Sequence, residues 1–145
     1  MRIIEKIKTK QAAVNSESVT ICFLGDSVTQ GCFECYTTIK GEVDTVFDYR
    51  SAFSTRVKEI LNIIYPRVQI NIINSGISGD NILGGLSRLQ RDVMQYHPDL
   101  LVLSYGLNDC TRGEQGLESY LDALRSILKR TNEENVEVIF LTQNY

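Results

Sequence analysis

The sequence has no large excess of charge of either sign and no long apolar run. Its 15 basic and 18 acidic residues leave a net charge of -3. This balance provides no excess of positive charge for binding nucleic acid or an anionic membrane. No apolar stretch is long enough to cross a bilayer, so we expect no membrane-spanning segment. A small molecule is therefore the first expectation for a partner.

The N-terminus lacks the continuous apolar core and the small-residue cleavage site of a signal peptide. Residues 1–18 are polar and weakly periodic, with isoleucines placed among lysines and glutamates. Without an export signal we expect a cytoplasmic protein with reduced thiols. The cysteines concerned are Cys22, Cys32, Cys35 and Cys110.

Cys32 and Cys35 have the spacing of half a zinc site or of a redox motif. A structural zinc site needs four ligands, and the sequence has no second pair of this kind. We therefore expect neither a metal site nor a redox function here. No cofactor is expected elsewhere in the chain.

Four runs rich in aliphatic residues predict buried strands, at residues 19–24, 68–73, 100–104 and 136–141. Apolar residues at helical spacing predict helices at 49–65, 81–96 and 117–130. Strands that alternate with helices indicate a parallel sheet covered by helices on both faces, here as one domain over residues 19–145. Residues 31–48 have no sustained period, and we expect a long loop that could line an acyl or sugar pocket.

In an open parallel sheet, sites form beyond the carboxyl ends of the strands. Three such ends carry polar, Gly-rich sequence: Gly25-Asp26-Ser27, residues 74–81, and Gly106-Leu107-Asn108-Asp109. Each alone is typical of a turn or a helix cap. Together they offer a hydroxyl nucleophile, a backbone N–H and a side-chain amide. These are the groups that stabilise a tetrahedral oxyanion, and one such donor is worth roughly 3 kcal/mol of barrier.

These three blocks, in this order, resemble the first three sequence blocks of the SGNH (GDSL) hydrolase family. The resemblance covers about residues 19–145 and implies a flavodoxin-like, three-layer α/β/α fold. It also implies metal-free hydrolysis of a small ester or thioester through an acyl-enzyme, with acylated carbohydrates and lipids among the substrates.

Carried over residue by residue, the resemblance makes Ser27 the nucleophile, Gly79 the backbone oxyanion donor and Asn108 the side-chain donor. Gly76 is the weaker candidate, because the family glycine precedes an aspartate, as Gly79 does. For the neighbouring aspartates, the default role is to cap helices or to hold the turns, and contact with substrate is the alternative. These are Asp26, Asp80 and Asp109.

The sequence departs from the family in its last block, an Asp-x-x-His that supplies the catalytic base. The only histidine, His97, precedes the strand at 100–104, whereas Asn108 follows it. About five strand residues at about 3.3 Å each separate the two by roughly 15 Å, beyond hydrogen-bond reach. We therefore expect a chain that is C-terminally truncated relative to the family. Such a chain would leave apolar surface uncovered and would tend to self-associate.

Three functional hypotheses remain open. The leading one is a serine ester hydrolase in a form that lacks its own His/Asp base, so that activity of the chain as given is uncertain. The alternative is a non-catalytic protein of the same fold that binds a small molecule or a carbohydrate. A flavodoxin-like nucleotide or phosphate binder is weaker, because no Gly-rich turn matches a phosphate-cradling motif with its lysine.

Overall fold

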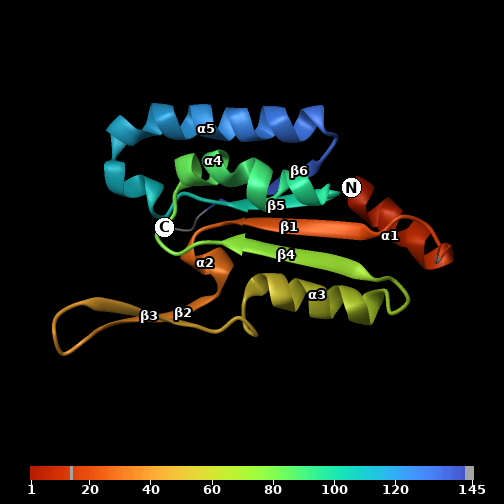
Figure 1. Ribbon diagram of the computed structural model, residues 1–145, viewed down its shortest axis with the longest axis horizontal. Coiled ribbons are helices and arrows are strands. Elements are labelled where there is room, and N and C mark those ends of the chain that lie inside the picture. The colour runs from red at the N-terminus through yellow and green to blue at the C-terminus, as the bar shows by residue number, and fades with distance from the viewer. Residues whose placement is uncertain (14, 143–145) are drawn as a thin grey trace.

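A computed structural model of the protein describes residues 1–13 and 15–142. Its centre is a four-stranded parallel sheet (Figure 1). In spatial order the strands are β4 (Ile70–Gly76), β1 (Val19–Gly25), β5 (Leu100–Ser104) and β6 (Glu137–Phe140). Counted along the chain, these parallel strands follow the order 2-1-3-4 of flavodoxin-like folds. The predicted fold class is confirmed.

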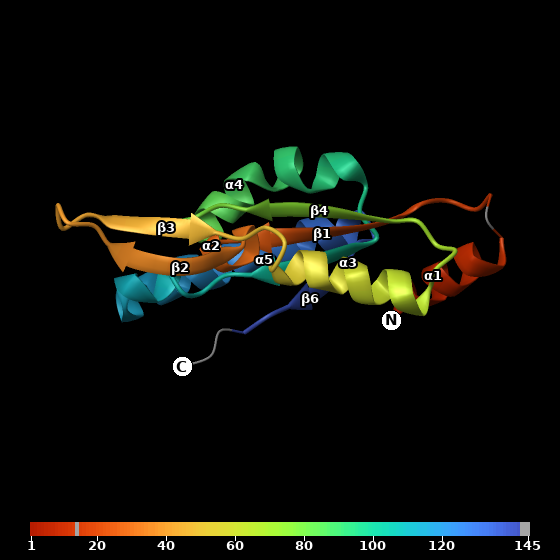
Figure 2. The ribbon, with the colours of Figure 1, turned by 90° about the horizontal axis from the view of Figure 1, so that it is seen from below.

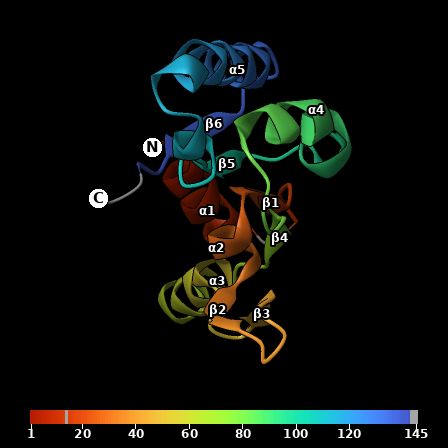
Figure 3. The same cartoon turned by 90° about the vertical axis from the view of Figure 1, so that its left-hand side faces the viewer.

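Helices cover both faces of the sheet and give three layers (Figures 2 and 3). One face carries α1 (Arg2–Ala12) and α3 (Phe53–Ile64), and the other carries α4 (Ile82–Asp92) and α5 (Glu114–Glu133). Shorter helices are α2 (Ser27–Gln30) and the 3₁₀ turns η1 (Met94–Tyr96) and η2 (Asp109–Arg112). None of the helices in the described ranges has the length and apolar character needed to span a lipid bilayer.

Strand β1 is buried along its whole length and contributes side chains to both hydrophobic layers. Val19, Ile21 and Phe23 pack in the cluster beneath α1 and α3, while Cys22 and Leu24 join the cluster beneath α4 and α5. This alternation follows from the two-residue period of a strand. Each large apolar side chain buried in this way stabilises the fold by about 1.5–3 kcal/mol. The central strand is therefore a rigid platform for the turn that follows it.

The N-terminal segment contains a helix, α1, that the polar composition of residues 1–18 did not predict. Ile3 and Ile7 lie one turn apart on this helix and are 3% and 0% exposed. The helix is also held by polar contacts, since the Ile3 N–H donates to Glu137 Oε2 at 3.0 Å and Lys6 pairs with Asp99 at 2.5 Å. Residues 2–12 are therefore part of the packed domain.

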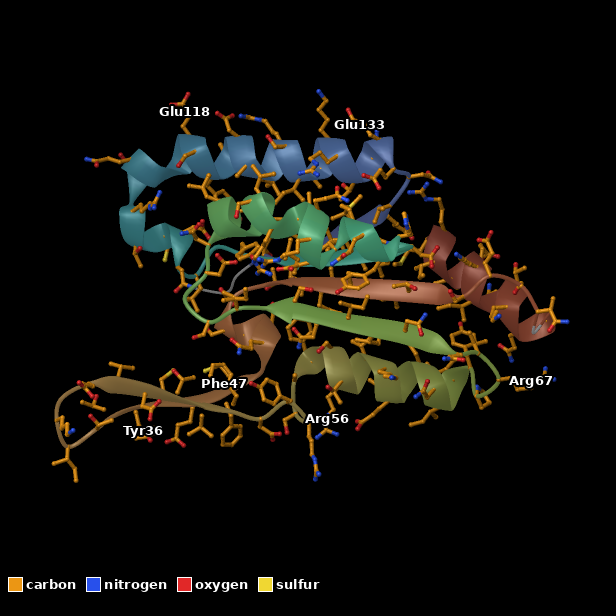
Figure 4. All side chains as sticks on the ribbon, viewed as in Figure 1. Tyr36, Phe47, Arg56, Arg67, Glu118 and Glu133 are labelled. Carbon is orange, nitrogen blue, oxygen red and sulfur yellow. The ribbon has the colours of Figure 1, made fainter. Side chains whose placement is uncertain are left out.

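Residues 31–48, expected to form a loop, instead form a projecting β-hairpin (Figure 4). Its strands are β2 (Cys32–Thr37) and β3 (Val43–Phe47), paired antiparallel. Most of its side chains are exposed, including Phe33 at 69%. A strand with neither face buried has no reason to alternate apolar and polar residues, so the sequence pattern could not reveal it.

The other predicted elements are present with shifted ends. Helix α3 begins at Phe53 rather than near residue 49, and α4 ends at Asp92 before the chain continues into η1. Strand β6 lies at an edge of the sheet and its side chains are only half-buried. On α5, Leu117 and Leu128 are 55% and 40% exposed.

Candidate active site

Three polar turns leave the sheet at the same edge, the carboxyl ends of β4, β1 and β5 (Figure 3). Gly25, the last residue of β1, pairs with Gly76 of β4 on one side and with Ser104 of β5 on the other. The direction of the strand order reverses between β1 and β5, which is where open α/β sheets form their binding crevice. Ser27 and Asn108 therefore follow the two strands that border this switch point.

Ser27 is the first residue of α2 and is partly exposed. The preceding Asp26 caps this helix, because its Oδ1 accepts a hydrogen bond from the Val28 N–H at 3.0 Å. No group in residues 1–13 or 15–142 is hydrogen-bonded to the Ser27 hydroxyl. Helix α2 lies directly on β4, since a Cβ at Gly76 would overlap the backbone of Gln30. The cap and this close packing fix the serine while its hydroxyl stays unengaged.

The turn after β4 leaves one amide unused. The Ile77 N–H donates to Gly25 O at 3.1 Å, the Ser78 N–H to Gln30 Oε1 at 2.7 Å, and the Asp80 N–H to Ile77 O at 3.1 Å. Between residues 76 and 80, the Gly79 N–H is the one amide without a partner in the described part of the chain. Gly79 has a φ of +76°, a conformation that glycine adopts without steric cost.

Asn108 connects the turn after β5 to the turn that contains Gly79. Its Nδ2 donates to the Asp80 carbonyl at 2.8 Å, and its own carbonyl accepts from Thr111 Oγ1 at 2.8 Å. A side-chain amide has two N–H groups. The bond to Asp80 orients the amide and leaves its second N–H free of partners among the described residues. The Gly76 N–H, by contrast, donates to Asn74 Oδ1 at 3.0 Å and is not free.

A buried arginine on α4, which the sequence reasoning missed, ties these turns together. The Arg88 side chain is 7% exposed and donates to the carbonyls of Gly25 and Ser75, at 3.1 and 2.7 Å. It also forms ion pairs with Asp80 at 2.8 Å and with Asp92 at 3.0 Å. The planar guanidinium has five donors, which allows one side chain to hold several acceptors in fixed positions.

Tyr105, directly after β5, completes this cluster. Its hydroxyl accepts from Arg88 at 2.7 Å and donates to Asp80 Oδ2 at 2.8 Å. Burial, together with the bond to the Asp80 carboxylate, raises the pKa of the Tyr105 hydroxyl, so it stays a neutral donor. A Cβ at Gly85 would overlap the tyrosine ring, so only glycine lets α4 approach this closely. No local pattern in the sequence marks Arg88, because it lies beside the apolar stripe of its helix and not within it.

The three aspartates expected beside the site all bind protein groups. Asp80 pairs with Arg88, Asp26 caps α2, and Asp109 Oδ1 accepts from the Ile82 N–H at 3.0 Å, at the start of α4. Asp26 is fully buried, and its second oxygen has no hydrogen-bond partner among the described residues. Burial raises the pKa of the Asp26 carboxyl, and the negative charges of Asp109 and Asp80 raise it further.

His97 lies at the opposite edge of the sheet from Ser27. It follows η1 and precedes β5, in a left-handed conformation with φ +46°. It borders a cleft of about 360 Å³ together with Lys6 and Asp99, at the amino ends of the strands. The length of β5 separates this cleft from Asn108. Ser27 therefore has no imidazole within reach among the described residues.

Replacing Arg88 with methionine should destabilise the protein strongly, because it leaves the carboxylate of Asp80 buried without its cation. We expect a loss of about 3–5 kcal/mol in the free energy of unfolding, measured by urea denaturation. Arg91→Met is the matched control. Arg91 binds the same Asp92, but its side chain is 70% exposed, and we expect a loss below about 1 kcal/mol. Equal, small losses in both variants would show that the cluster does not hold the turns.

Residues 23–144 match the model of the GDSL-like lipase/acylhydrolase family. An acetylxylan esterase of Geobacillus stearothermophilus is 26% identical over 134 residues, which are 86% of this chain and 59% of the esterase. The thioesterase 1/protease 1/lysophospholipase L1 of Escherichia coli strain K12 is 28% identical over 122 residues, 84% of this chain and 50% of that protein.

Solved structures give the same fold. A variant of an acetyl xylan esterase from Geobacillus stearothermophilus superposes with a TM-score of 0.67 at 25% identity, covering 90% of this chain and 62% of that one. A two-domain esterase active on acetylated mannans has a TM-score of 0.68 at 23% identity, covering 95% of this chain and 33% of that one. The chain thus spans about three fifths or less of the length of these relatives. The family match extends over most of the chain, and the protein belongs to the GDSL-like lipase/acylhydrolase family.

Proposed function

We propose that this chain carries the acyl-attack site of a serine ester hydrolase, with Ser27 as nucleophile and with Gly79 N–H and Asn108 Nδ2 as oxyanion donors. One observation carries the proposal. Between residues 76 and 80 the other amides are bonded and the Gly79 N–H is free, and one Asn108 N–H and the Ser27 hydroxyl are likewise without partners among the described residues. Gly79 is exposed and Asn108 is partly exposed, so a substrate oxygen can reach both donors from solvent.

The mechanism follows from these groups. Ser27 Oγ bonds to the acyl carbon, and the carbonyl oxygen gains the negative charge that the two donors stabilise. The serine proton passes to solvent water. Collapse of the tetrahedral intermediate then breaks the ester C–O bond, the leaving oxygen takes up a proton from water to give the alcohol, and an acyl-serine remains. Water then attacks the same carbon and releases the acid. Because the donors are fixed before the reaction, each lowers the activation barrier by about 3 kcal/mol.

The step that this chain performs poorly is removal of the proton from Ser27. The one histidine of the sequence lies at the far edge of the sheet, beyond β5. Asp26, beside the serine, is engaged in capping α2. General-base catalysis typically accelerates a reaction by about 10²–10⁴-fold, and the chain as given lacks this acceleration. This observation also favours the second candidate, a non-catalytic protein that binds its ligand through the same donors.

For the alcohol part of the substrate we propose a carbohydrate, held in a cleft of about 530 Å³ beside α2. The cleft begins at Gln30, one helical turn after Ser27. Its lining is rich in hydrogen-bonding groups: Gln30, Tyr49, Ser54, Thr55, Lys58 and Asn74. The Lys58 ammonium has no partner among the described residues and is free to donate. The acetylated carbohydrates named for two of the relatives support this choice.

Tyr49 provides an apolar surface at the rim of this cleft. It is 60% exposed, and its ring stacks on Phe47 with centroids 6.1 Å apart and planes at 9° (Figure 4 marks Phe47). The stacking holds the tyrosine ring in place at low cost in conformational entropy. An aromatic face beside several hydroxyl and amide groups suits a sugar ring, which has an apolar face and a rim of hydroxyls.

Removal of the serine hydroxyl tests the catalytic part of the proposal. We expect the wild-type chain to hydrolyse an activated short-chain aryl ester slowly, and Ser27→Ala to reduce the rate to the uncatalysed background. Ser18→Ala, at an exposed serine before β1, should retain the wild-type rate. Residual activity unchanged in Ser27→Ala would contradict the assignment. A wild-type rate equal to that of a full-length family member would contradict the absence of a base.

A binding experiment tests the carbohydrate cleft independently of catalysis. Calorimetric titration with an acetylated xylo-oligosaccharide should show a dissociation constant raised at least about fivefold in Tyr49→Ala, since aromatic stacking is worth about 1 kcal/mol. Tyr96→Ala is the control, at a similarly exposed tyrosine on the opposite edge of the sheet. Ser27→Ala should bind like the wild type. Equal affinities in all variants would place the sugar elsewhere.

A further inference from the structure

Two cysteines on the projecting hairpin lie side by side. Cys32 Sγ and Cys35 Sγ are 3.6 Å apart, and Cys35 Sγ is 3.7 Å from Thr45 Oγ1 on β3. Residues three apart on a regular strand point to opposite faces. The pairing of β2 with β3 shifts register between Cys32 and Glu34, which pair with the adjacent residues Phe47 and Val46. This bulge brings both thiols to the same side of the hairpin.

Both thiols can be reached from solvent, unlike that of Cys22. Cys35 is exposed and Cys32 is partly exposed, on a hairpin that projects from the domain (Figures 1 and 4). Cys22 lies in the core, where burial raises its pKa to about 12, so it forms little thiolate at neutral pH. Cys110 is exposed but its sulfur donates to the Leu107 carbonyl at 2.9 Å. Within the hairpin, therefore, a mixed disulfide formed on one cysteine can be attacked by the thiol of the other.

We propose that Cys32 and Cys35 are an oxidisable dithiol, which a small disulfide such as glutathione disulfide converts to an intramolecular disulfide. The 3.6 Å gap must shorten to about 2.05 Å, which rotation of exposed side chains on a free hairpin can provide. The spacing alone did not favour a redox role. The bulge in the strand pairing brings the two sulfur atoms close together, and the sequence spacing of the cysteines does not reveal this bulge.

The exchange has two steps. The Cys35 thiolate attacks one sulfur of glutathione disulfide, forms a mixed disulfide and releases one glutathione thiolate, which takes up the proton that Cys35 lost. Cys32 then loses its proton and attacks Cys35 Sγ, and the second glutathione leaves and takes up that proton. The two cysteines are oxidised, and glutathione disulfide is reduced to two glutathione molecules. Burial and the contact with Cys35 raise the pKa of the Cys32 thiol, which disfavours Cys32 as the first thiolate to attack.

The cross-link would lie next to the helix that carries Ser27. Cys32 follows Gly31, the residue that ends α2, and the Gly31 N–H donates to Ser27 O at 3.0 Å. The Gly31 carbonyl accepts from the Asp48 N–H at 2.9 Å, where the hairpin returns to the domain. The disulfide would fix the bulge at the base of the hairpin. The inference rests on the geometry of the hairpin and stands whether or not Ser27 is a nucleophile.

The test is oxidation of the full chain in glutathione redox buffers, followed by acid quenching, alkylation and mass spectrometry of the intact protein and its peptides. We expect the wild type to lose two of its four thiols and two hydrogen atoms, with a peptide linked through Cys32 and Cys35. Cys110→Ser should form the same link and lose two of its three remaining thiols. Cys32→Ser should stop at a glutathione adduct on Cys35, without the loss of two hydrogens.

Two results on the wild-type chain would overturn the proposal, whatever the variants do. One is a set of glutathione adducts on Cys35 and Cys110, with no intramolecular cross-link at any ratio of glutathione disulfide to glutathione. The other is a disulfide that links two chains. Both are read from peptide masses and are independent of esterase activity.

Discussion

The buried guanidinium of Arg88 is the interaction on which the candidate site depends. It holds the carbonyls that end β1 and β4, the carboxylate of Asp80 and the hydroxyl of Tyr105. Asp80 in turn fixes Asn108 through its carbonyl. One side chain on α4 therefore sets the relative positions of three turns that come from three strands. Such preorganisation is what an oxyanion site requires, because donors that must rearrange lose most of their value.

The cost of this arrangement is a set of buried polar groups. Arg88 and the fully buried Asp26 lie at the carboxyl edge of the sheet, and a buried ion pair seldom stabilises a fold more than apolar residues would. The layers that compensate come from ordinary packing of α1, α3, α4 and α5 on the sheet. Burial raises the pKa of the Asp26 carboxyl. The fold tolerates this burial because Asp26 Oδ1 accepts the hydrogen bond that caps α2. The stability of the domain thus lies in its core, and its buried polar groups gather at the edge that carries the candidate site.

Most of the fold could be predicted from the sequence because its core elements carry strong periodic signals. The aliphatic runs of β1 and β5 and the helical spacing of α3 and α5 each identify one element, and their alternation identifies the parallel sheet. Ser27, Gly79 and Asn108 stand out because they follow such strands. The elements that were missed have weaker signals. Helix α1 buries only a narrow stripe, through Ile3 and Ile7, and the hairpin buries neither face. The role of Arg88 depends on contacts between distant segments, which no local pattern encodes.

We propose that this chain has an attack site without the base that would drive it. The most direct measurement is a crystal structure of the chain with Ser27 covalently modified by an alkyl fluorophosphonate, whose phosphorus mimics the tetrahedral carbon. We expect the phosphoryl oxygen within about 3 Å of both Gly79 N and Asn108 Nδ2. We also expect no histidine nitrogen within hydrogen-bond distance of Ser27 Oγ. A phosphoryl oxygen directed away from both donors, or modification at another serine, would contradict this proposal.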